Sequence, residues 1–350
     1  MGSEADPPAD LPPAILVMGP TAAGKTEVAL KLAERLPVGL ISVDSAQIYR
    51  GLDIGSAKPE PACLARHPHA LIDIRDPRQT YSVAEFIRDC REAMLRLAGE
   101  GRVPLLVGGT MMYFRALLYG LDKMPPADPV LRRQIEHEAE RRGWESLHRE
   151  LAQADPGCAA RIEPGDRQRI ARGLEILRAT GRGPSDWRRH NRIPVLKSLR
   201  LVLAPSCRHI LHQRIERRFD QMMEQGFLEE MRTLRKLDGL NAGCSAIRSV
   251  GYRQAWAMMD GEFGSDQLPA RVRAATRQLA KRQLTALRGL SRTLWYDPGL
   301  NGTINRVLRR VEAFCGVSTD SSGSVAESGA APSDARLSNG RSIKNTRQSQ

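Results

Sequence analysis

The chain has 350 residues, 41% of them hydrophobic, and a formal net charge of +13, which is typical of a globular protein of one large or two modest domains. Apolar runs stay well short of the roughly 18 residues of a membrane span, and residues 1–13 are acidic and rich in Pro and Ala, unlike a secretory signal. We expect residues 1–13 to be flexible. The six cysteines lie far apart without a C-x-x-C pair, which argues against structural zinc or a disulfide framework and favours a reducing cytoplasm.

The first motif along the chain has the G-x-x-x-x-G-K-[S/T] spacing of a phosphate-binding loop. It stands between residues 15–18, an expected buried strand, and residues 28–36, whose apolar side chains have helical spacing. Glycines let successive backbone N–H groups turn inward, and the helix adds its positive N-terminus. Lys25 would reach the terminal phosphate, and the Thr26 hydroxyl can bind Mg²⁺. The motif predicts a binding site for a di- or triphosphate, and it leaves the reaction open. The predicted binding residues are Gly19, Pro20, Thr21, Ala22, Ala23, Gly24, Lys25 and Thr26.

Strand and helix patterns alternate after this loop. Strands are expected at residues 40–43 and 103–107, and helices at 81–98 and 112–118. This alternation predicts an α/β fold, a P-loop NTPase-like parallel sheet covered by helices, with ligands beyond the carboxyl ends of the strands. Asp44 follows a strand there, although an Asp in this position is also a common helix N-cap. Gly108 and Gly109 end the strand at 103–107, where an NTP hydrolase would usually place an acidic residue, so ATP hydrolysis is disfavoured.

The second half reads mainly as helix. Prolines at 125, 126 and 129 mark a boundary, charged helices follow at 130–151 and 166–179, and an apolar strand returns at 199–203. We therefore predict an all-helical insertion over 125–196 within a core made of 14–124 and 197–315. Further helices are expected at 209–225, 228–237 and 268–290. Residues 316–350 contain almost no large apolar side chains and are expected to be disordered.

Positive charge is concentrated after the first third of the chain. Residues 125–315 carry 35 Lys and Arg against 22 Asp and Glu, whereas residues 1–124 carry 14 against 15. A basic half suggests a polyanionic partner, most often nucleic acid, although a solvated helical surface is the alternative. On the helix at 268–290, the basic residues Arg273, Arg277, Lys281 and Arg288 share one face, and only Asp266 lies nearby in sequence. This face is expected to contact an anion.

Eight segments, in order, together resemble the tRNA dimethylallyltransferases, or tRNA isopentenyltransferases. They are residues 19–26, 44–50, 54–59, 73–77, 108–114, 168–172, 248–253 and 276–283. The lack of a C-terminal Cys/His zinc finger resembles the bacterial type. The resemblance implies transfer of a dimethylallyl group from dimethylallyl diphosphate to N6 of adenosine 37 of tRNA, next to the anticodon. It also implies Mg²⁺ as cofactor and a cytoplasmic, monomeric enzyme whose insertion contacts tRNA.

The resemblance also implies roles for residues. Asp44 would be the general base, Thr21 would lie near the reacting centre, and Arg253 would stabilise the leaving diphosphate together with Lys25 and a Mg²⁺ ion on Thr26. Contacts to tRNA map onto Asp44, Ser45, Ala46, Gln47, Thr110, Arg132, Gln168, Arg169, Ile170, Ala171, Arg172, Arg248, Ser249, Val250, Gly251, Tyr252, Arg253, Lys281, Arg282, Gln283, Leu284, Thr285, Ala286, Leu287 and Arg288.

The sequence departs from the family at Ala286, where an aromatic residue is expected, and at Ala23, where Ser is commoner. Two other interpretations stay open on the residues alone. A P-loop kinase acting on a small metabolite with ATP would account for the loop at 19–26 but not for the basic half. A non-catalytic RNA-binding module would account for the charge but not for the loop together with Asp44.

Overall fold

The structure, a computed structural model, describes residues 11–122, 124–187 and 194–316. Its centre is a six-stranded parallel sheet in the order β3-β2-β4-β1-β5-β6. The inner strands read as nearly continuous apolar runs because helices cover both faces of the sheet. The predicted P-loop NTPase-like α/β architecture is confirmed. The strands are β1 (Ala14–Met18), β2 (Val38–Val43), β3 (His69–Ala70), β4 (Val103–Gly108), β5 (Ser198–Leu203) and β6 (Thr293–Tyr296).

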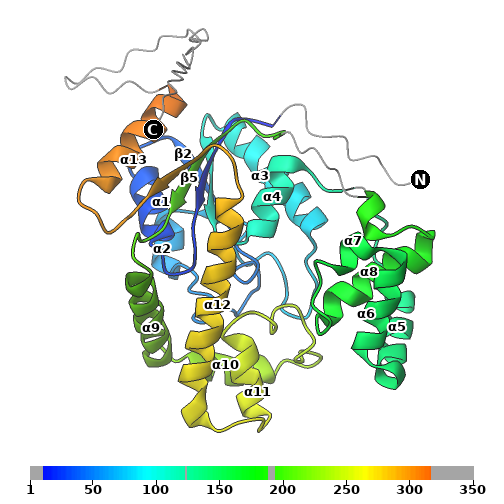
Figure 1. The fold of residues 1–350 in the computed structure, drawn as a ribbon. Coiled ribbons are helices and arrows are strands. Elements are labelled where there is room, and N and C mark those ends of the chain that lie inside the picture. The colour runs from blue at the N-terminus through cyan, green and yellow to red at the C-terminus, as the bar shows by residue number, and fades with distance from the viewer. Residues whose placement is uncertain (1–10, 123, 188–193, 317–350) are drawn as a thin grey trace, which may run out of the picture.

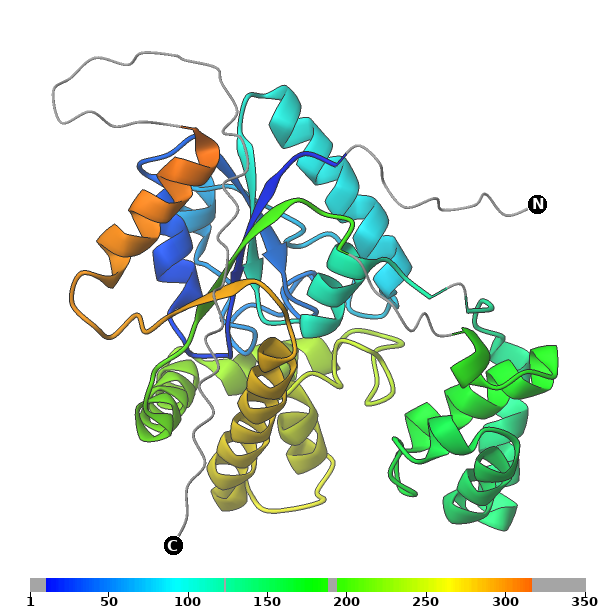
Figure 2. The same ribbon diagram turned by 45° about the horizontal axis from the view of Figure 1, so that its top comes forward.

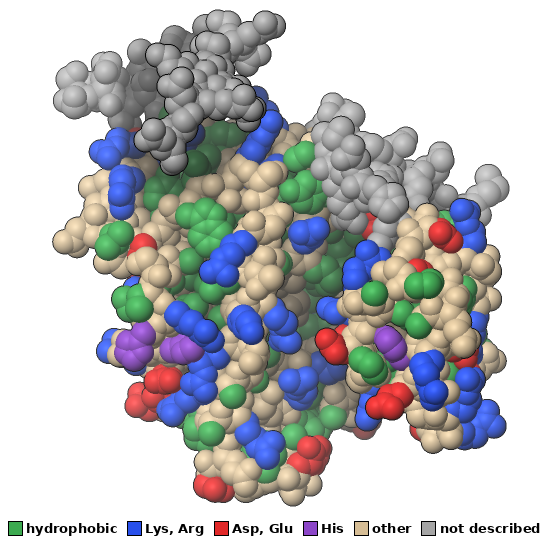
Figure 3. Space-filling view, in the orientation of Figure 1, with side chains coloured by type: hydrophobic (Ala, Val, Ile, Leu, Met, Phe, Trp, Pro, Cys, Tyr) green, Lys and Arg blue, Asp and Glu red, His purple; other side chains and the backbone are tan. Residues whose placement is uncertain are grey.

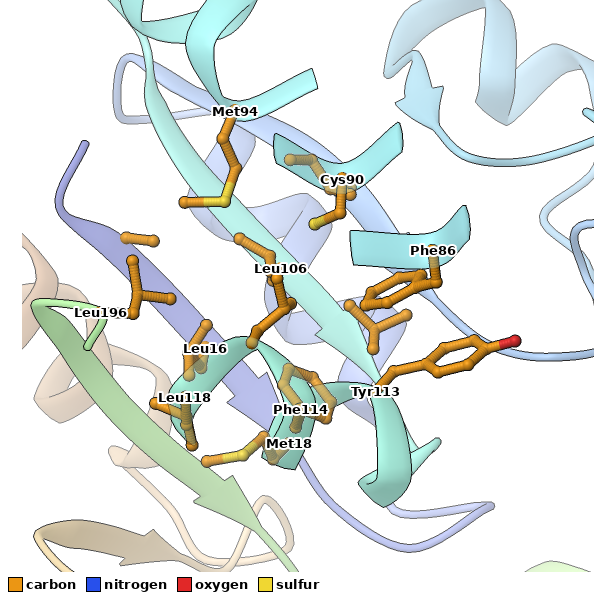
Figure 4. Close-up of a cluster of buried hydrophobic side chains, with 14 of the residues drawn as sticks. Leu16, Met18, Phe86, Cys90, Met94, Leu106, Tyr113, Phe114, Leu118 and Leu196 are labelled. Carbon is orange, nitrogen blue, oxygen red and sulfur yellow. The ribbon is translucent and has the colours of Figure 1, made fainter. Parts of the chain in front are cut away.

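Helices lie on both faces of the sheet (Figure 1), and each face has its own hydrophobic core. Helices α1 (Lys25–Ala33) and α13 (Thr303–Cys315) cover one face, and α3 (Val83–Gly99) and α4 (Met111–Tyr119) cover the other. Figure 4 shows the second core, where Phe86 of α3 stacks on Tyr113 of α4 with ring centroids 4.1 Å apart. These two cores hold the strands rigidly and so fix the loops that follow them.

The carboxyl ends of β1, β4 and β2 lie level with one another. Gly108 pairs in register with Met18 on one side and with Val43 on the other. A Cβ atom on Gly108 would lie 2.1 Å from the carbonyl oxygen of Val43, so only glycine allows this approach. The residues that come next, Gly19, Gly109 and Asp44, therefore start in one row, with Gly109 in the middle.

A layer of helices lies beyond these strand ends (Figure 1). It packs on the chain after β2 through a third hydrophobic cluster, which includes Tyr49, Phe227 and Tyr252. Its helices are α9 (Arg208–Glu224), α10 (Phe227–Arg235), α11 (Tyr252–Met259) and α12 (Leu268–Arg288). A short helix, α2 (Pro61–Arg66), lies between β2 and β3, and a 3₁₀ turn at Ser265–Gln267 leads into α12.

Four helices stand apart from the sheet in both Figure 1 and Figure 2. They are α5 (Pro129–Arg142), α6 (Trp144–Ala154), α7 (Pro156–Ala159) and α8 (Arg167–Thr180), with a 3₁₀ turn at Pro184–Trp187, and they bury a hydrophobic cluster of their own. The single helix predicted for 130–151 is wrong. Gly143, at φ +78°, interrupts it and begins α6.

Several elements were not predicted from the sequence, namely β3, β6, α2, α7, α11 and α13. Of the segments expected to be flexible or disordered, residues 1–10 and 317–350 lie outside the described residues. Residues 11–13 form no helix or strand, and Gly316 follows the end of α13. Among the described helices, none combines the length and the apolar character needed to cross a bilayer.

Candidate active site

The phosphate loop joins β1 to the uncapped N-terminus of α1. Ala22 (φ 61°) and Gly24 (φ 81°) take left-handed conformations, which curl the backbone. Gly24 is the N-cap of α1 and offers no side chain to bond the first N–H groups of the helix. Free N–H groups at a helix N-terminus form an anion site. The sequence motif thus folds into a loop that can receive a phosphate.

Lys25 folds back over this loop, and its Nζ donates to the carbonyl oxygen of Pro20 at 2.8 Å. Burial, together with the positive charge of Arg218, lowers the pKa of Lys25 to about 8, against an opposing effect of Asp44. Within the described part of the chain, Lys25 forms no ion pair with a carboxylate. An anion that enters the loop would therefore meet an ammonium group without a competing partner.

A cavity of about 640 Å³ opens from the phosphate loop and collects residues from distant parts of the chain. Thr21, Ala22, Lys25 and Thr26 line it from the loop, and Asp44 to Gln47 line it from the turn after β2. Gly108, Gly109 and Thr110 line it from the end of β4. The cavity thus unites the three loops that the sequence placed at the carboxyl ends of the strands.

Asp44 uses one carboxylate oxygen to hold its own turn. Its Oδ1 accepts from the backbone N–H groups of Ala46 (2.8 Å) and Gln47 (3.3 Å), which is the local capping role that the sequence left open. For Oδ2, no hydrogen bond to another described residue is present. Asp44 is also the only carboxylate among the described residues that line the cavity. One oxygen therefore orients the side chain and the other is free to accept a proton.

Arg218 of α9 brings a second cation to the cavity. Its Nη2 donates to the carbonyl oxygen of Ser56 at 3.3 Å, and it forms no ion pair with any carboxylate of the described residues. Burial lowers the pKa of Arg218, while Asp44 opposes this shift. The sequence analysis missed Arg218. The sequence does contain a sign of this position. Arg218 lies on the face of α9 that otherwise carries the apolar residues Ile215, Phe219 and Met222, and these also line the cavity.

The remaining wall of the cavity is apolar. Its side chains come from α9, α10 and α12, and all lie beyond the ends of the strands. They are Ile215, Phe219, Met222, Phe227, Val272 and Leu279. The cavity has a phosphate loop, the cations Lys25 and Arg218 beside it, an apolar wall and a carboxylate oxygen with no hydrogen-bond partner among the described residues. It suits a ligand that has a diphosphate at one end and a hydrocarbon at the other.

Comparison with known proteins agrees with this geometry. Residues 47–289 match the IPP transferase family. The chain is 52% identical to the tRNA dimethylallyltransferase of Stenotrophomonas maltophilia (strain K279a) over 298 residues, which are 83% of the chain and 94% of that protein. It is 54% identical to the tRNA dimethylallyltransferase of Thiobacillus denitrificans (strain ATCC 25259 / T1) over 279 residues, which are 79% and 89% of the two chains. The chain belongs to the tRNA dimethylallyltransferase family.

Solved structures lead to the same family. The crystal structure of the full-length tRNA isopentenylpyrophosphate transferase of Bacillus halodurans superposes with a TM-score of 0.63 at 32% identity. The superposition covers 87% of this chain and 97% of that one. The family predicted from sequence motifs is thus confirmed, and with it the enzymatic transfer of a dimethylallyl group to tRNA.

Arg253 does not lie where the resemblance to dimethylallyltransferases suggested. Residues 248–251 of its segment line the main cavity, but Arg253 is exposed and lines a separate cavity of about 490 Å³ with Arg271 and Phe263. The side chain turns away because it lies in the first turn of α11, directly after the buried Tyr252. The structure brings Arg218, and not Arg253, to the cavity that holds Lys25.

The basic face predicted on α12 is partly wrong. Arg273 pairs with Asp220 of α9, and Arg277 pairs with Glu216 of α9 at 3.3 Å. Lys281, Arg282 and Arg288 are exposed and, within the described residues, carry no ion pair. Lys and Arg side chains line the face of this helix shown in Figure 3. The C-terminal half of α12 thus keeps exposed cations without acidic partners among the described residues.

Some side chains in the predicted tRNA segments are buried in the protein. Gln283 and Leu287 are buried, and Leu287 belongs to the core under α4. Leu284 is half-buried, whereas Thr285 is exposed and Ala286 lines the cavity. In the insertion, Ile170 and Ala171 are core residues. The side chains of Leu287, Ile170 and Ala171 pack in these cores and hold their neighbours in place.

Several arginines of the insertion are paired with acidic residues. Arg132 and Arg172 both bond Glu175, which is 1% exposed and also accepts from the backbone N–H of Asp128 at 2.7 Å. Gln168 and Arg169 are exposed, and Arg169 lines the main cavity while pairing with Asp166 at 3.4 Å. Of the predicted contacts in the insertion, Arg169 is thus the one that the structure brings to the cavity.

Proposed function

We propose that this cavity transfers the dimethylallyl group of dimethylallyl diphosphate to N6 of adenosine 37 of tRNA, with Asp44 as the general base. The observation that carries the proposal is the free oxygen of Asp44, which shares a single cavity with the phosphate loop and the apolar wall. A kinase that uses ATP has less support, because β4 ends in glycines where an NTP hydrolase places an acid and because the wall beyond the loop is apolar.

The donor would bind across the two chemically different ends of the cavity. Its diphosphate would accept hydrogen bonds from the loop at 19–26, with Lys25 and Arg218 supplying positive charge. Its five-carbon chain would lie against the apolar wall from α9, α10 and α12. Cations already in place would stabilise the negative charge that develops on the leaving oxygen. We therefore assign to Arg218 the role that the sequence analysis gave to Arg253.

The acceptor would enter as a base removed from its stack, because a closed cavity cannot admit a stacked adenine. The N6 amine attacks the first carbon of the dimethylallyl group, the N–C bond forms, and the C–O bond to diphosphate breaks. Oδ2 of Asp44 takes the proton that N6 loses, and diphosphate leaves with the electron pair of the broken bond. The Thr21 side chain lines the cavity and would hydrogen-bond near the reacting atoms.

Mg²⁺ fits the oxygen donors present. Thr26 and Ser42 offer hydroxyl groups to the cavity, and the described residues contain no cluster of three His, Cys, Asp or Glu that would hold a metal by itself. An ion at Thr26 would therefore take its remaining ligands from the diphosphate and water, as Mg²⁺ commonly does. When bound, it neutralises charge on the leaving diphosphate.

Basic side chains around the cavity would bind the RNA backbone. Arg248, Arg282 and Arg169 line the cavity from three different segments, and Lys281 and Arg288 extend the positive charge along α12. Phosphate contacts of this kind position an RNA without reading its sequence. The proposal places the enzyme in the cytoplasm, acting as a monomer on the anticodon stem-loop of tRNA.

A label-transfer assay tests the proposal. The full chain is incubated with Mg²⁺, dimethylallyl diphosphate labelled in the dimethylallyl group and unmodified tRNA, and a parallel reaction contains labelled ATP. We expect label in tRNA, on adenosine 37 after nuclease digestion, and none from ATP. Phosphate transfer from ATP to a small molecule, or RNA binding without transfer, would overturn the proposal.

A further inference from the structure

One buried amide connects the two halves of the reaction cavity. Gln283 of α12 is 9% exposed, and its side chain reaches between the loop after β1 and the loop after β4. Its Oε1 accepts from the backbone N–H of Thr21 at 2.9 Å, and its Nε2 donates to the carbonyl oxygen of Gly109 at 2.9 Å. The partners lie 262 and 174 residues away in the chain, so the contact is a product of the fold.

The second of these bonds leads on to the catalytic turn. Thr110, next to Gly109, accepts on its Oγ1 from the backbone N–H of Ser45 at 3.1 Å. The Thr110 N–H also donates to the carbonyl oxygen of Val43 at 3.2 Å. Residues 43 and 45 flank Asp44. A continuous series of hydrogen bonds therefore runs from the phosphate loop through Gln283 to the turn of the proposed base.

The space around the amide is full. A Cβ atom on Gly109 would lie 2.5 Å from Nε2 of Gln283, which is closer than any real contact. Both ends of the amide already have well-placed partners in the protein. One lone pair of Oε1 and one N–H of Nε2 are thus already used within the protein, so the observed role of the amide is to join the two loops.

We propose that Gln283 is a positioning residue that sets the distance between the phosphate loop and Asp44. The inference rests on the proposed function, because it assigns the leaving group to the first loop and the proton acceptor to the second. Transfer requires the nucleophile, the reacting carbon and the leaving oxygen to be held within a narrow geometry. A single side chain that bonds both loops meets this need. Gln283 reaches the cavity from α12. The residues before it on this helix, Lys281 and Arg282, are exposed and carry positive charge.

Two variants test this from opposite sides of the contact. Gln283→Met keeps the length and helix propensity of the side chain but removes both hydrogen bonds. Gly109→Ala keeps Gln283 and pushes its amide away with a Cβ atom. Lys281→Ala is the matched control, an exposed cation two residues earlier on the same helix. For each protein, pyrophosphate affinity is measured by calorimetry, affinity for an anticodon stem-loop RNA by filter binding, and transfer by single-turnover rates at saturating substrates.

We expect both variants to weaken pyrophosphate binding about tenfold and to slow single-turnover transfer about 10- to 100-fold, with RNA affinity within about twofold of wild type. Lys281→Ala should do the reverse, weakening RNA binding and leaving pyrophosphate binding unchanged. Weaker RNA binding by Gln283→Met with normal pyrophosphate binding would overturn the inference in favour of an RNA contact. If Gln283→Met does not fold, Gly109→Ala serves as the test. Wild-type pyrophosphate affinity and transfer rate for Gly109→Ala would also overturn the inference. Pyrophosphate binding needs no transfer, so failure of wild type to label tRNA would refute the proposed function separately.

Discussion

The reaction cavity and the helical insertion are both rich in cations, but they use them in different ways. In the cavity, Lys25 and Arg218 are held by carbonyl oxygens, and within the described residues neither has an acidic ion-pair partner. In the insertion, Arg132 and Arg172 share the buried Glu175, and Arg142 and Arg178 share Glu138 and Glu150.

The difference teaches where charge is available to a ligand. A cation buried without a counterion is unfavourable in the empty protein and becomes favourable when an anion arrives. A cation already paired with a carboxylate contributes to architecture and gains less from an incoming phosphate. Net charge counted along the sequence, which is concentrated after residue 124, does not distinguish these two cases. The predictions below test the distinction.

The largest effect is expected from Asp44→Asn. The variant keeps an oxygen that can accept from the N–H groups of Ala46 and Gln47, but it removes the group that takes the proton from N6. The transfer rate at saturating substrates should fall by about 10²- to 10⁴-fold, while tRNA affinity stays within twofold of wild type. Asp76→Asn, at a half-buried position that does not line the cavity, is the control. A rate near that of wild type would show that another group is the base.

The second effect concerns the unpaired arginine. Arg218→Gln removes a cation that has no acidic partner among the described residues. The substitution should therefore weaken binding of the donor, dimethylallyl diphosphate. We expect the KM for dimethylallyl diphosphate to rise about 10- to 100-fold, as for the loss of a hydrogen bond to a charged group. Arg217→Gln, the exposed neighbour on α9, should change this KM by less than twofold. Equal effects of the two variants would contradict a special role for Arg218.

Much of the site could be predicted because its parts are local. The phosphate loop is one continuous motif. Thr110 follows β4, which neighbours β1, and Asp44 follows β2 on the other side of β4, so a parallel α/β pattern was enough to place them at one edge of the sheet. The resemblance to a known family then supplied the reaction, which composition and spacing had left open.

The parts that escaped prediction depend on contacts between distant segments. Arg218 and Gln283 reach the cavity from helices far along the chain, and nothing in the phosphate motif points to either. The basic face of α12 was read along a single helix, whereas Asp220 and Glu216 neutralise it from α9. Arg253 was placed by its segment, but the start of α11 turns its side chain outward.

A smaller effect is expected from pH. The pKa of Lys25 in the free enzyme is lowered to about 8, and a bound diphosphate favours the ammonium form and raises this pKa. Above pH 8 the donor must therefore bind together with a proton, and its affinity should fall by up to about tenfold per pH unit, measured by calorimetry without tRNA. Below pH 8, Lys25 is charged in both states and contributes no dependence. The donor phosphate itself titrates near pH 6, outside this window.

Lys25→Arg provides the control for this titration. A guanidinium stays charged throughout the range, so the dependence above pH 8 should disappear even if the affinity itself changes. A variant that keeps the same slope as wild type would show that another group takes up the proton.

The smallest effect on transfer, but a clear one on stability, is expected from Glu175→Gln in the insertion. The amide keeps the volume of Glu175 and an acceptor for the N–H of Asp128, but it loses the charge that Arg132 and Arg172 share. The free energy of unfolding should fall by about 1–3 kcal/mol, measured by urea denaturation, with the saturated transfer rate within about twofold of wild type. Glu145→Gln, at an exposed position of α6, should cost less than about 0.5 kcal/mol. Equal costs would contradict a stabilising role for the pairing of Arg132 and Arg172 with Glu175.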